Sequence, residues 1–430
     1  MTQRPHPDYY DYTYDMFIAS VDGEQSEAAR FMDWIDVATQ DGVYAFEAPR
    51  LGAQTPVVQA RRTDGMPLEL LNFSSYNYLG YAAHPEVIDA AKAALDRYGL
   101  GAASSPVQGG TSELHVELER RLLDFIGLPN RGVSLFSSGY AVNTGTISAI
   151  MKRRHHIVVD KSAHMSTLEG AQLARSKIHY FEHNDADHLA EVLAPLAGTG
   201  ARILVCTEGV FSADGDFGKL DEIVPVAKRF GAQVLVDEAH SFLLCGARGR
   251  GVAEMQGVLD QIDYFVVTFS KALGGIGGAL IAKREVARYV NWYARCRMFS
   301  CALDPAVTAG VTRALELASS SDGAARRERL QARSTQLRAA LAPHVELGRS
   351  ASWIVPVIFG PEHLTIPLYD HLQRAGLDGS VMSFPAVPVG EARVRLFASS
   401  EHSEEQIVRC AEIIRQAAHE LGFTRSERQS

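Results

Sequence analysis

The sequence predicts an α/β protein built on a mostly parallel sheet of seven strands, followed by a smaller α/β domain. Between 132 and 282, short apolar runs rich in β-branched residues alternate with amphipathic stretches, as in βα units that form a parallel sheet. Beyond this region the chain becomes rich in helical patterns. We therefore expect an N-terminal arm or small-domain segment at 1–70, a large domain at 71–303, and a linking helix with a small C-terminal domain at 304–430.

The expected strands of the large domain are four to six residues long and mostly apolar. They are Val133–Phe136, Ile157–Asp160, Ile178–Phe181, Arg202–Thr207, Gln233–Asp237, Tyr264–Thr268 and Gly278–Ala282. The segments between them keep apolar residues at helical spacing. This spacing predicts helices at Gly139–Arg153, His164–Ala174, Ala186–Leu196 and Leu220–Phe230.

The two ends of the chain are patterned differently. Residues 1–60 show a helical pattern at Ala28–Ala38 and little else. The tyrosines in the first fifteen residues could pack on a partner subunit, which we favour, contact a membrane or carrier protein, or be disordered. Asp304–Ala342, rich in Ala, Leu, Arg and Glu, predicts one long helix or two. The remaining expected elements are two apolar strands and two amphipathic helices, at Ser352–Phe359, Arg393–Ala398, Ile366–Ala375 and Ser403–Leu421.

Composition excludes several classes of protein. The 430 residues are 46% hydrophobic and 22% charged, which is the balance of a globular protein with a sizeable core. A net charge of −9 without a basic block argues against nucleic acid as a partner. The five cysteines form no C-x-x-C pair, so we expect neither a disulfide framework nor a metal site.

The chain has no pattern typical of export or membrane insertion. Its acidic, tyrosine-rich start lacks the basic and apolar regions of a signal peptide. No stretch approaches the ~18 consecutive apolar residues of a transmembrane helix. We expect a cytoplasmic protein without a transmembrane segment, and docking at the inner face of the membrane stays open.

Two neighbouring strand ends carry the residues with the clearest chemistry. Asp237 ends one buried strand, in the run VDEAHS, and Lys271 follows the next, in TFSKALGG. Open α/β sheets bind ligands at the carboxyl ends of their strands. Pyridoxal phosphate needs a lysine for its aldehyde and a carboxylate for its ring nitrogen. Its phosphate suits backbone N–H groups at a helix start, which Ser138, Gly139 and Tyr140 supply.

Each of these features alone has a simpler interpretation. Lys271 could be a surface charge, Asp237 a helix cap and the run GGIGG a tight turn. The run also departs from the G-x-G-x-x-G dinucleotide pattern. The ordered set of Asp-x-x-His, Thr-x-x-Lys-x-x-Gly-Gly and an upstream Ser-Gly-aromatic turn favours the cofactor site.

The chain resembles the α-oxoamine synthases, a branch of the fold-type-I pyridoxal-phosphate (PLP) enzymes. The resemblance runs from about Asn72 to about His402 and rests on eight motifs. They are NFSSYNYLG, GTSELHVELE, FSSGYAVN, DKSAHMS, EGVFSADGD, VDEAHS with GARGRGV, TFSKALGG and RVRLFASSEH. Details such as SYNYLG, QIDYFVVTFSK and MFSCALDPAV are most similar to bacterial serine palmitoyltransferases, which serve sphingolipid synthesis.

The resemblance implies a role for each matching residue. Lys271 would bind the cofactor covalently and move the α-proton, Asp237 would pair with the ring nitrogen, and His164 would stack on the ring. The other implied contacts are His240 and Ser212 at the ring oxygen, Gly139, Tyr140 and Thr268 at the phosphate, Ser300 at the phosphate of a neighbouring subunit, and Asn77 at the substrate. His164 could instead be a helix-start histidine bonded to backbone.

The implied reaction is a decarboxylative Claisen condensation within a homodimer that shares its active sites. An L-amino acid, with serine favoured, would condense with an acyl thioester of CoA or of a carrier protein, releasing CO₂ and a free thiol. His164 is our candidate for stabilising the charge that develops on the thioester oxygen. With serine and a palmitoyl thioester the product would be 3-ketosphinganine.

Two positions depart from the family pattern. Ser383 stands where the family commonly has an arginine that binds the amino-acid carboxylate, and Ser104-Ser105-Pro106 replaces a G-S-R run. A carboxylate in a closed site needs a cationic partner. Arg395 is the best substitute by motif match, although it could instead pair with a surface acid. The departures leave the amino acid and the acyl carrier undecided.

Three other functions compete with this one. Alanine or glycine could replace serine in the same reaction, as in 8-amino-7-oxononanoate synthase or glycine C-acetyltransferase. A transaminase of the same fold should lack the EGVFSADGD and GARGRGV runs. A non-catalytic regulatory subunit tends to lose the lysine, whereas Lys271 is present.

Overall fold

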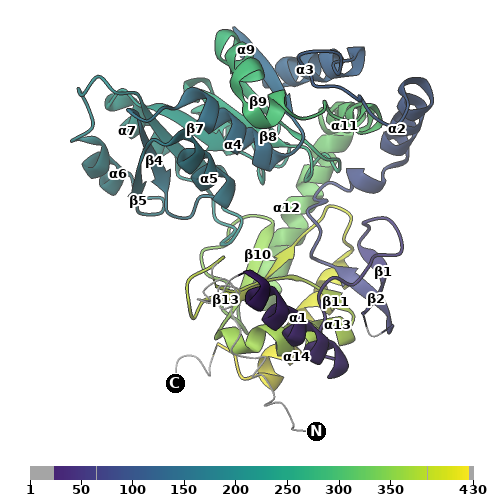
Figure 1. The fold of residues 1–430 in the computed structure, drawn as a ribbon. Coiled ribbons are helices and arrows are strands. Elements are labelled where there is room, and N and C mark those ends of the chain that lie inside the picture. Colours follow the sequence, from purple (N-terminus) through teal and green to yellow (C-terminus); the bar gives the residue numbers. More distant parts are fainter. Residues whose placement is uncertain (1–23, 64, 385, 426–430) are drawn as a thin grey trace. The chain divides into compact units, whose positions relative to one another are not determined.

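The computed structural model describes residues 24–63, 65–384 and 386–425, which form two compact units (Figure 1). The sheet unit comprises Tyr76–Ser212 and Asp216–Arg329. The terminal unit comprises the described residues up to Ser75, the segment Ala213–Gly215, and the described residues from Leu330 on. The domain boundaries predicted at 70/71 and 303/304 stay a prediction. The tyrosines at 9, 10, 12 and 14 lie outside the described residues.

The sheet unit contains the seven predicted strands, joined in the order β3-β9-β8-β7-β6-β4-β5. Their bounds are β3 Arg131–Phe136, β4 His156–Asp160, β5 Lys177–Phe181, β6 Ile203–Glu208, β7 Gln233–Asp237, β8 Tyr264–Thr268 and β9 Gly278–Lys283. β9 pairs antiparallel with β3 and β8, and the remaining pairs of neighbouring strands are parallel. Every residue of β4, β6 and β8 is buried, as expected of parallel strands covered on both faces. The predicted fold class is confirmed.

The helices of this unit connect and cover the strands (Figure 1). The four predicted between strands are α4 Gly139–Ile150, α5 Met165–Ala174, α6 Ala186–Leu193 and α7 Leu220–Arg229. The others are α2 Pro85–Tyr98, α3 Glu113–Ile126, α8 Val252–Met255, α9 Arg284–Tyr293, α10 Arg295–Met298 and α11 Pro305–Ala318, with short 3-10 turns η2 Tyr81–Ala83 and η3 Leu259–Gln261. The parallel strands place their carboxyl ends at one edge of the sheet, which is where Asp237 and Lys271 lie.

The stretch Asp304–Ala342 folds as two helices, α11 and α12 (Ser321–Leu341). Asp304 caps α11 by accepting the amide of Val307 at 3.0 Å. Ser319 and Ser320 end this helix, and their hydroxyls donate to the carbonyls of Leu315 and Leu317. Such serine bonds to the backbone compete with helix continuation, which explains the break.

The terminal unit contains two small sheets, β1-β2-β11 and β10-β13-β12. Its strands are β1 Val57–Arg61, β2 Pro67–Asn72, β10 Ile354–Gly360, β11 Leu377–Asp378, β12 Ser380–Met382 and β13 Ala392–Phe397. Its helices are α1 Glu24–Gln40, the 3-10 turn η4 Glu362–Leu364, α13 Thr365–Arg374 and α14 Glu404–Glu420. The predicted small C-terminal α/β domain is therefore confirmed, with a buried core that includes Val355, Leu396 and Ile414.

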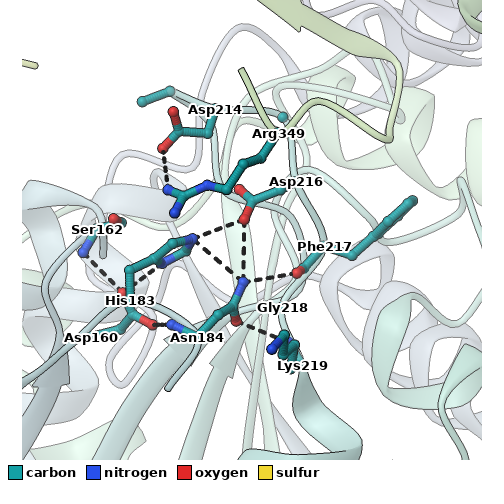
Figure 2. A network of polar contacts seen from close by, with 12 residues as sticks. Asp160, Ser162, His183, Asn184, Asp214, Asp216, Phe217, Gly218, Lys219 and Arg349 are labelled. Carbon is teal, nitrogen blue, oxygen red and sulfur yellow. Dashed lines mark hydrogen bonds and ion pairs between the residues drawn. The ribbon is translucent and has the colours of Figure 1, made fainter. Parts of the chain in front are cut away.

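The segment Ala213–Gly215 packs with the terminal unit, although the residues on both sides of it belong to the sheet unit. The carbonyl of Gly215 accepts the amide of Ser352 at 3.0 Å. Asp214 pairs with Arg393 at 2.6 Å. It also pairs with Arg349 at 3.5 Å (Figure 2). Part of the loop between β6 and α7 is thus held by ion pairs.

Candidate active site

Asp237 lies at the end of β7 and is 7% exposed. Its Oδ2 accepts Asn143 Nδ2 at 2.6 Å, and its Oδ1 accepts the amide of Ala239 at 2.9 Å. Asn143 is buried in α4, one turn after Gly139. A buried carboxylate needs such donors, because burial without them would favour its neutral form. The predicted acid is therefore held in a fixed orientation.

A second acid, Glu208, ends the neighbouring strand β6 directly opposite Asp237 in the strand register. It is buried, and its Oε1 accepts the backbone amide of His164. Burial, together with the nearby Asp237, raises the pKa of Glu208 well above its ordinary value, whereas the amide of His164 and the charge of Lys271 lower it. The site therefore combines two carboxyl groups, of which Glu208 favours the protonated form.

His164 caps the start of α5 and is connected to Asp237 by hydrogen bonds. Its Nδ1 accepts the amide of Ser166 at 3.2 Å and lies 2.8 Å from the Ser166 hydroxyl. That hydroxyl accepts Asn143 Nδ2 at 3.0 Å. Asn143 therefore bonds both to Asp237 and to the serine that contacts His164. Because Nδ1 accepts a backbone N–H, a neutral imidazole carries its proton on Nε2. The Tyr140 ring meets the His164 ring edge-on, with centroids 6.0 Å apart.

The start of α4 lies against the end of β8. Ser138 caps the helix by accepting the amide of Ala141 at 3.1 Å. A Cβ at Gly139 would lie 2.8 Å from Thr268 Oγ1, so glycine allows this close approach. Thr268 Oγ1 also lies 2.8 Å from the Ser270 hydroxyl. A helix start with exposed N–H groups beside two hydroxyls suits a phosphate.

Lys271 lies in the loop that leaves β8. Its Nζ lies 5.9 Å from the centre of the Tyr76 ring. Its carbonyl accepts the amide of Gly274. Gly274 has a φ of +68°, and a Cβ at this position would lie 2.3 Å from the Ala82 nitrogen, so the turn requires glycine. The same Tyr76 ring meets His240 edge-on at 5.8 Å. Tyr76 thus lies beside both predicted residues.

His240 follows Asp237 by three residues and is 5% exposed. Its Nδ1 lies 2.8 Å from the Tyr78 hydroxyl. Asn77, between the two tyrosines, accepts the amide of Ala82 at 3.1 Å through its Oδ1. That bond closes the turn before η2, which is a structural role for the residue predicted to contact substrate.

The last three predicted residues are Ser212, Ser300 and Arg395. Ser212 lies in the loop between β6 and α7. Ser300 lines a small cavity together with Ser137, next to the start of α4. Arg395 belongs to the terminal unit, where its Nη2 donates to the Ser380 hydroxyl at 2.9 Å and its guanidinium lies 5.0 Å from the Phe397 ring centre.

Sequence reasoning missed Asn143, Glu208 and Tyr76. Glu208 could have been found by the rule that selected Asp237, since both are acids at the carboxyl end of a buried strand. Asn143 and Tyr76 lie within quoted motifs, FSSGYAVN and NFSSYNYLG, but carry no local signal of their contacts. The contacts join elements that are far apart in sequence.

The donor set fits pyridoxal phosphate. It offers a lysine amine, a buried carboxylate for the pyridine nitrogen, and a glycine-tight helix start for the phosphate. Asn143 Oδ1 is buried and has no hydrogen-bond partner within the described part of the chain. A polar atom of this kind is consistent with a site built for a polar group.

Comparison with known proteins identifies the family. A family model for aminotransferase class I and II matches residues 69–414. The 8-amino-7-oxononanoate synthase of Geotalea daltonii is 37% identical over 358 residues, which cover 83% of this chain and 90% of that protein. The same enzyme from Citrifermentans bemidjiense is 36% identical over 393 residues, or 91% of this chain and 99% of that protein.

Solved structures of serine palmitoyltransferase are similar over nearly the whole chain. The enzyme from S. paucimobilis matches with a TM-score of 0.86 and 31% identity, covering 93% of this chain and 99% of that one. The Sphingomonas wittichii enzyme gives 0.85 and 30%, with the same coverage. The chain therefore belongs to the aminotransferase class I and II family and, within it, to the α-oxoamine synthases, which are PLP-dependent acyltransferases that condense an amino acid with an acyl thioester and release CO₂.

Proposed function

We propose that Lys271 carries pyridoxal phosphate through its Nζ and then removes the α-proton of the amino-acid substrate. Its place after β8, beside Tyr76 and close enough to Glu208 to lower the pKa of that acid, supports this role. The bound cofactor supplies an electron sink for negative charge on the α-carbon. Asp237, held by Asn143, keeps the pyridine nitrogen protonated.

His164 orients the substrate and stabilises the thioester oxygen as charge develops there. The bonds at its Nδ1 support this proposal, because they leave the proton of the neutral ring on Nε2. A neutral donor near the reacting carbonyl stabilises an oxyanion without prior reorganisation. Glu208 fixes the backbone of His164 and so holds the ring in place.

The remaining predicted residues contact the ring oxygen, the phosphate or the substrate. We assign His240 and Ser212 to the ring oxygen, and Gly139, Tyr140 and Thr268 to the phosphate. The close approach of Gly139 to Thr268 supports the second assignment. Asn77 and Arg395 stay proposed substrate contacts, with Arg395 as the cation for the amino-acid carboxylate.

The amino substrate we favour is L-serine, and the acyl donor is a long acyl thioester. One observation carries this choice: the serine palmitoyltransferase structures match 93% of the chain at TM-scores of 0.85–0.86. An 8-amino-7-oxononanoate synthase structure from Francisella tularensis covers 82% at 0.69. With serine, the product is the amino ketone from which sphingolipid synthesis starts.

The second candidate is the same reaction with alanine. It is favoured by sequence identity, since curated 8-amino-7-oxononanoate synthases reach 39% over 347 residues whereas the serine palmitoyltransferase structures reach 32%. Glycine is the third amino acid to test. The acyl carrier is CoA or a carrier protein.

A homodimer completes the site in this proposal, with Ser300 at the phosphate of the partner subunit. Phe299, its neighbour, is 85% exposed in the single chain, as expected of a residue that packs on a partner. Within residues 24–63, 65–384 and 386–425, no helix is long and apolar enough to cross a membrane. Contact with a long-chain substrate at the inner membrane surface stays part of the proposal.

A spectroscopic titration separates the amino substrates. Purified protein is saturated with PLP and titrated with L-serine, glycine and L-alanine, and the visible absorbance band of the lysine-bound cofactor is followed. We expect a saturable change with serine at the lowest concentration. A response to alanine alone would support the second candidate, and no response to any of the three would contradict the proposed reaction.

Product analysis then tests the acyl donor. The responding amino acid is incubated with acyl-CoA of increasing chain length and, separately, with acyl carrier protein, and CO₂ and free thiol are measured. Lys271→Ala is the matched control, because it removes the reacting amine and keeps the backbone carbonyl that accepts the amide of Gly274. Product formation by Lys271→Ala at the rate of the unmodified protein would overturn the catalytic assignment.

A further inference from the structure

His183 lies outside the residues assigned above, at the start of the loop after β5 (Figure 2). Its Nδ1 donates to Asp160 Oδ1 at 2.9 Å and its Nε2 donates to Asp216 Oδ2 at 2.8 Å. Its side chain is 9% exposed, and the two carboxylates are 0% and 10% exposed. Ionised carboxylates only accept hydrogen bonds, so both ring nitrogens must carry protons. The geometry therefore requires a buried imidazolium.

Asp160 anchors the loop that carries His164. It ends β4, and its Oδ1 accepts the amide of Ser162 at 2.9 Å, besides His183. Its carbonyl accepts the amide of Ala163 at 2.9 Å. The next residue, His164, caps α5, so the position of Asp160 determines the path of the chain that leads to His164.

Asp216 anchors the loop that carries Ser212. This loop is closed at its base by the antiparallel bridge between Val210 and Phe217, and the amide of Phe211 donates to the carbonyl of Asp216 at 3.1 Å. The ring of His183 meets the ring of Phe211 edge-on at 4.4 Å. His183 thus contacts the loop on both sides of Ser212.

Asn184 reinforces the same connection. Its amide donates to Asp160 Oδ2 at 3.1 Å, and its Nδ2 donates to Asp216 at 3.2 Å and to the carbonyl of Phe217 at 3.0 Å (Figure 2). Its Oδ1 accepts the amide of Lys219 at 2.9 Å. His183 and Asn184 therefore both bond to Asp160, which precedes His164, and to Asp216, in the loop that carries Ser212.

We propose that His183 is a positioning residue that ties the loop bearing His164 to the loop bearing Ser212 and so sets both side chains on the cofactor ring. The inference rests on the cofactor and on the roles proposed for His164 and Ser212, and it is independent of which amino acid or thioester reacts. His183 itself touches neither the cofactor nor the substrate in this assignment.

The charge of His183 follows from its surroundings. Burial lowers the pKa of its imidazole, but the hydrogen bonds and charges of Asp160 and Asp216 outweigh it and raise the pKa to about 9. The other charged neighbours, Lys161 and Glu182, pair with each other at the surface. The connection is therefore complete at neutral pH and weakens as His183 deprotonates near pH 9.

The test measures PLP binding by the apoprotein, and its readout is independent of catalysis. His183→Gln keeps one hydrogen bond at most, and we expect about tenfold weaker PLP binding at pH 7.5 and a shifted pH dependence of the visible absorbance band. The matched control is His179→Gln on the preceding strand β5, where the described contact of His179 is with His156. We expect the control to bind PLP as the unmodified protein does.

A second variant tests the charge with little change of shape. Asp216→Asn keeps an acceptor for His183 but removes one negative charge, so we expect the alkaline weakening of PLP binding to begin at a lower pH than in the unmodified protein. If His183→Gln does not fold, Asp216→Asn provides the test of the inference. Unchanged PLP affinity and pH dependence in a folded His183→Gln or Asp216→Asn variant, or equal losses in His179→Gln, would overturn the inference.

The outcome is distinguishable from failure of the proposed function. If the unmodified protein binds PLP but responds to no amino acid, the proposed reaction fails and the positioning role of His183 can still be measured. If serine responds and His183→Gln binds PLP normally, the proposed function stands and this inference is wrong.

Discussion

Asn143 donates its Nδ2 to Asp237 at 2.6 Å from the second turn of α4, and the same nitrogen donates to Ser166 at 3.0 Å. One amide thus connects the acid at the end of β7 with the serine that bonds to His164. A residue that no local pattern singled out therefore connects the acid predicted to pair with the ring nitrogen to the histidine predicted to stack on the ring. The orientation of both depends on how α4 packs over the sheet.

Replacing Asn143 with Ala should weaken cofactor binding and slow the reaction. The change removes a buried donor and leaves Asp237 Oδ2 without this partner, at a cost of about 1–3 kcal/mol. Asn143→Asp should be worse, because it places a second negative charge beside Asp237. PLP affinity measured by fluorescence should follow the order unmodified protein, Asn143→Ala, Asn143→Asp. Equal affinity of all three would show that the bond does not support the site.

Glu208 offers a pair of variants that separates hydrogen bonding from charge. Glu208→Gln keeps a carbonyl oxygen for the amide of His164, and Glu208→Ala removes it. Because burial and Asp237 favour the protonated form of Glu208, Gln is a close substitute at neutral pH. We expect kcat within about threefold of the unmodified protein for Gln and a loss of about tenfold or more for Ala.

The pH dependence gives a second check on Glu208. If the acid is protonated in the working enzyme, the rate profile of Glu208→Gln should match that of the unmodified protein between pH 6 and 8. A large loss in Glu208→Gln, with the fold intact by circular dichroism, would mean that ionised Glu208 is required.

Gly139→Ala should disrupt the proposed phosphate site. The added Cβ would lie 2.8 Å from Thr268 Oγ1 and 2.9 Å from its Cβ, so the start of α4 must move away from β8. We expect PLP affinity to fall at least tenfold, measured by equilibrium dialysis. Gly101→Ala is the control, since nothing lies within 4 Å of its added Cβ. Comparable affinity in the two variants would place the phosphate elsewhere.

The strands of the sheet unit could be predicted from sequence because each is a short apolar run ended by a polar or glycine residue. Asp237 and Lys271 could be predicted from the same pattern, and both lie at the carboxyl ends of parallel strands. Strands β1 and β2 were missed. Only alternate residues of β1 are buried, and β2 pairs with the distant, two-residue strand β11.

The contacts that organise the site could not be predicted, because they join residues that the fold alone brings together. Asn143 and Asp237 are 94 residues apart, and His183 reaches Asp216 over 33. Residues of these types are common in proteins, so a short stretch of sequence does not show which of them will contact each other. The hydrogen bond from Arg395 to Ser380 likewise depends on β13 pairing with β12.

His402 should make the stability of the protein depend on pH below neutrality. The ring stacks on Phe73 at 4.1 Å, its Nδ1 accepts the amide of Ser399 at 3.0 Å, and its Nε2 donates to the carbonyl of Asn72 at 3.2 Å. Burial, helped by the charge of Arg333, lowers the pKa of His402 to about 4, although its bond to Asn72 opposes this. The neutral imidazole is therefore the folded form.

The sign of the effect follows from proton uptake. Between pH 6.5 and 4 the unfolded chain binds a proton at His402 and the folded chain does not, so the free energy of unfolding falls as the pH falls through this range. From pH 7 to pH 5 the loss from this group is about 2 kcal/mol. His402→Gln keeps an acceptor and a donor but cannot titrate. We expect its urea unfolding midpoint to fall less than that of the unmodified protein over this interval, and equal falls would show that His402 is protonated in the folded state.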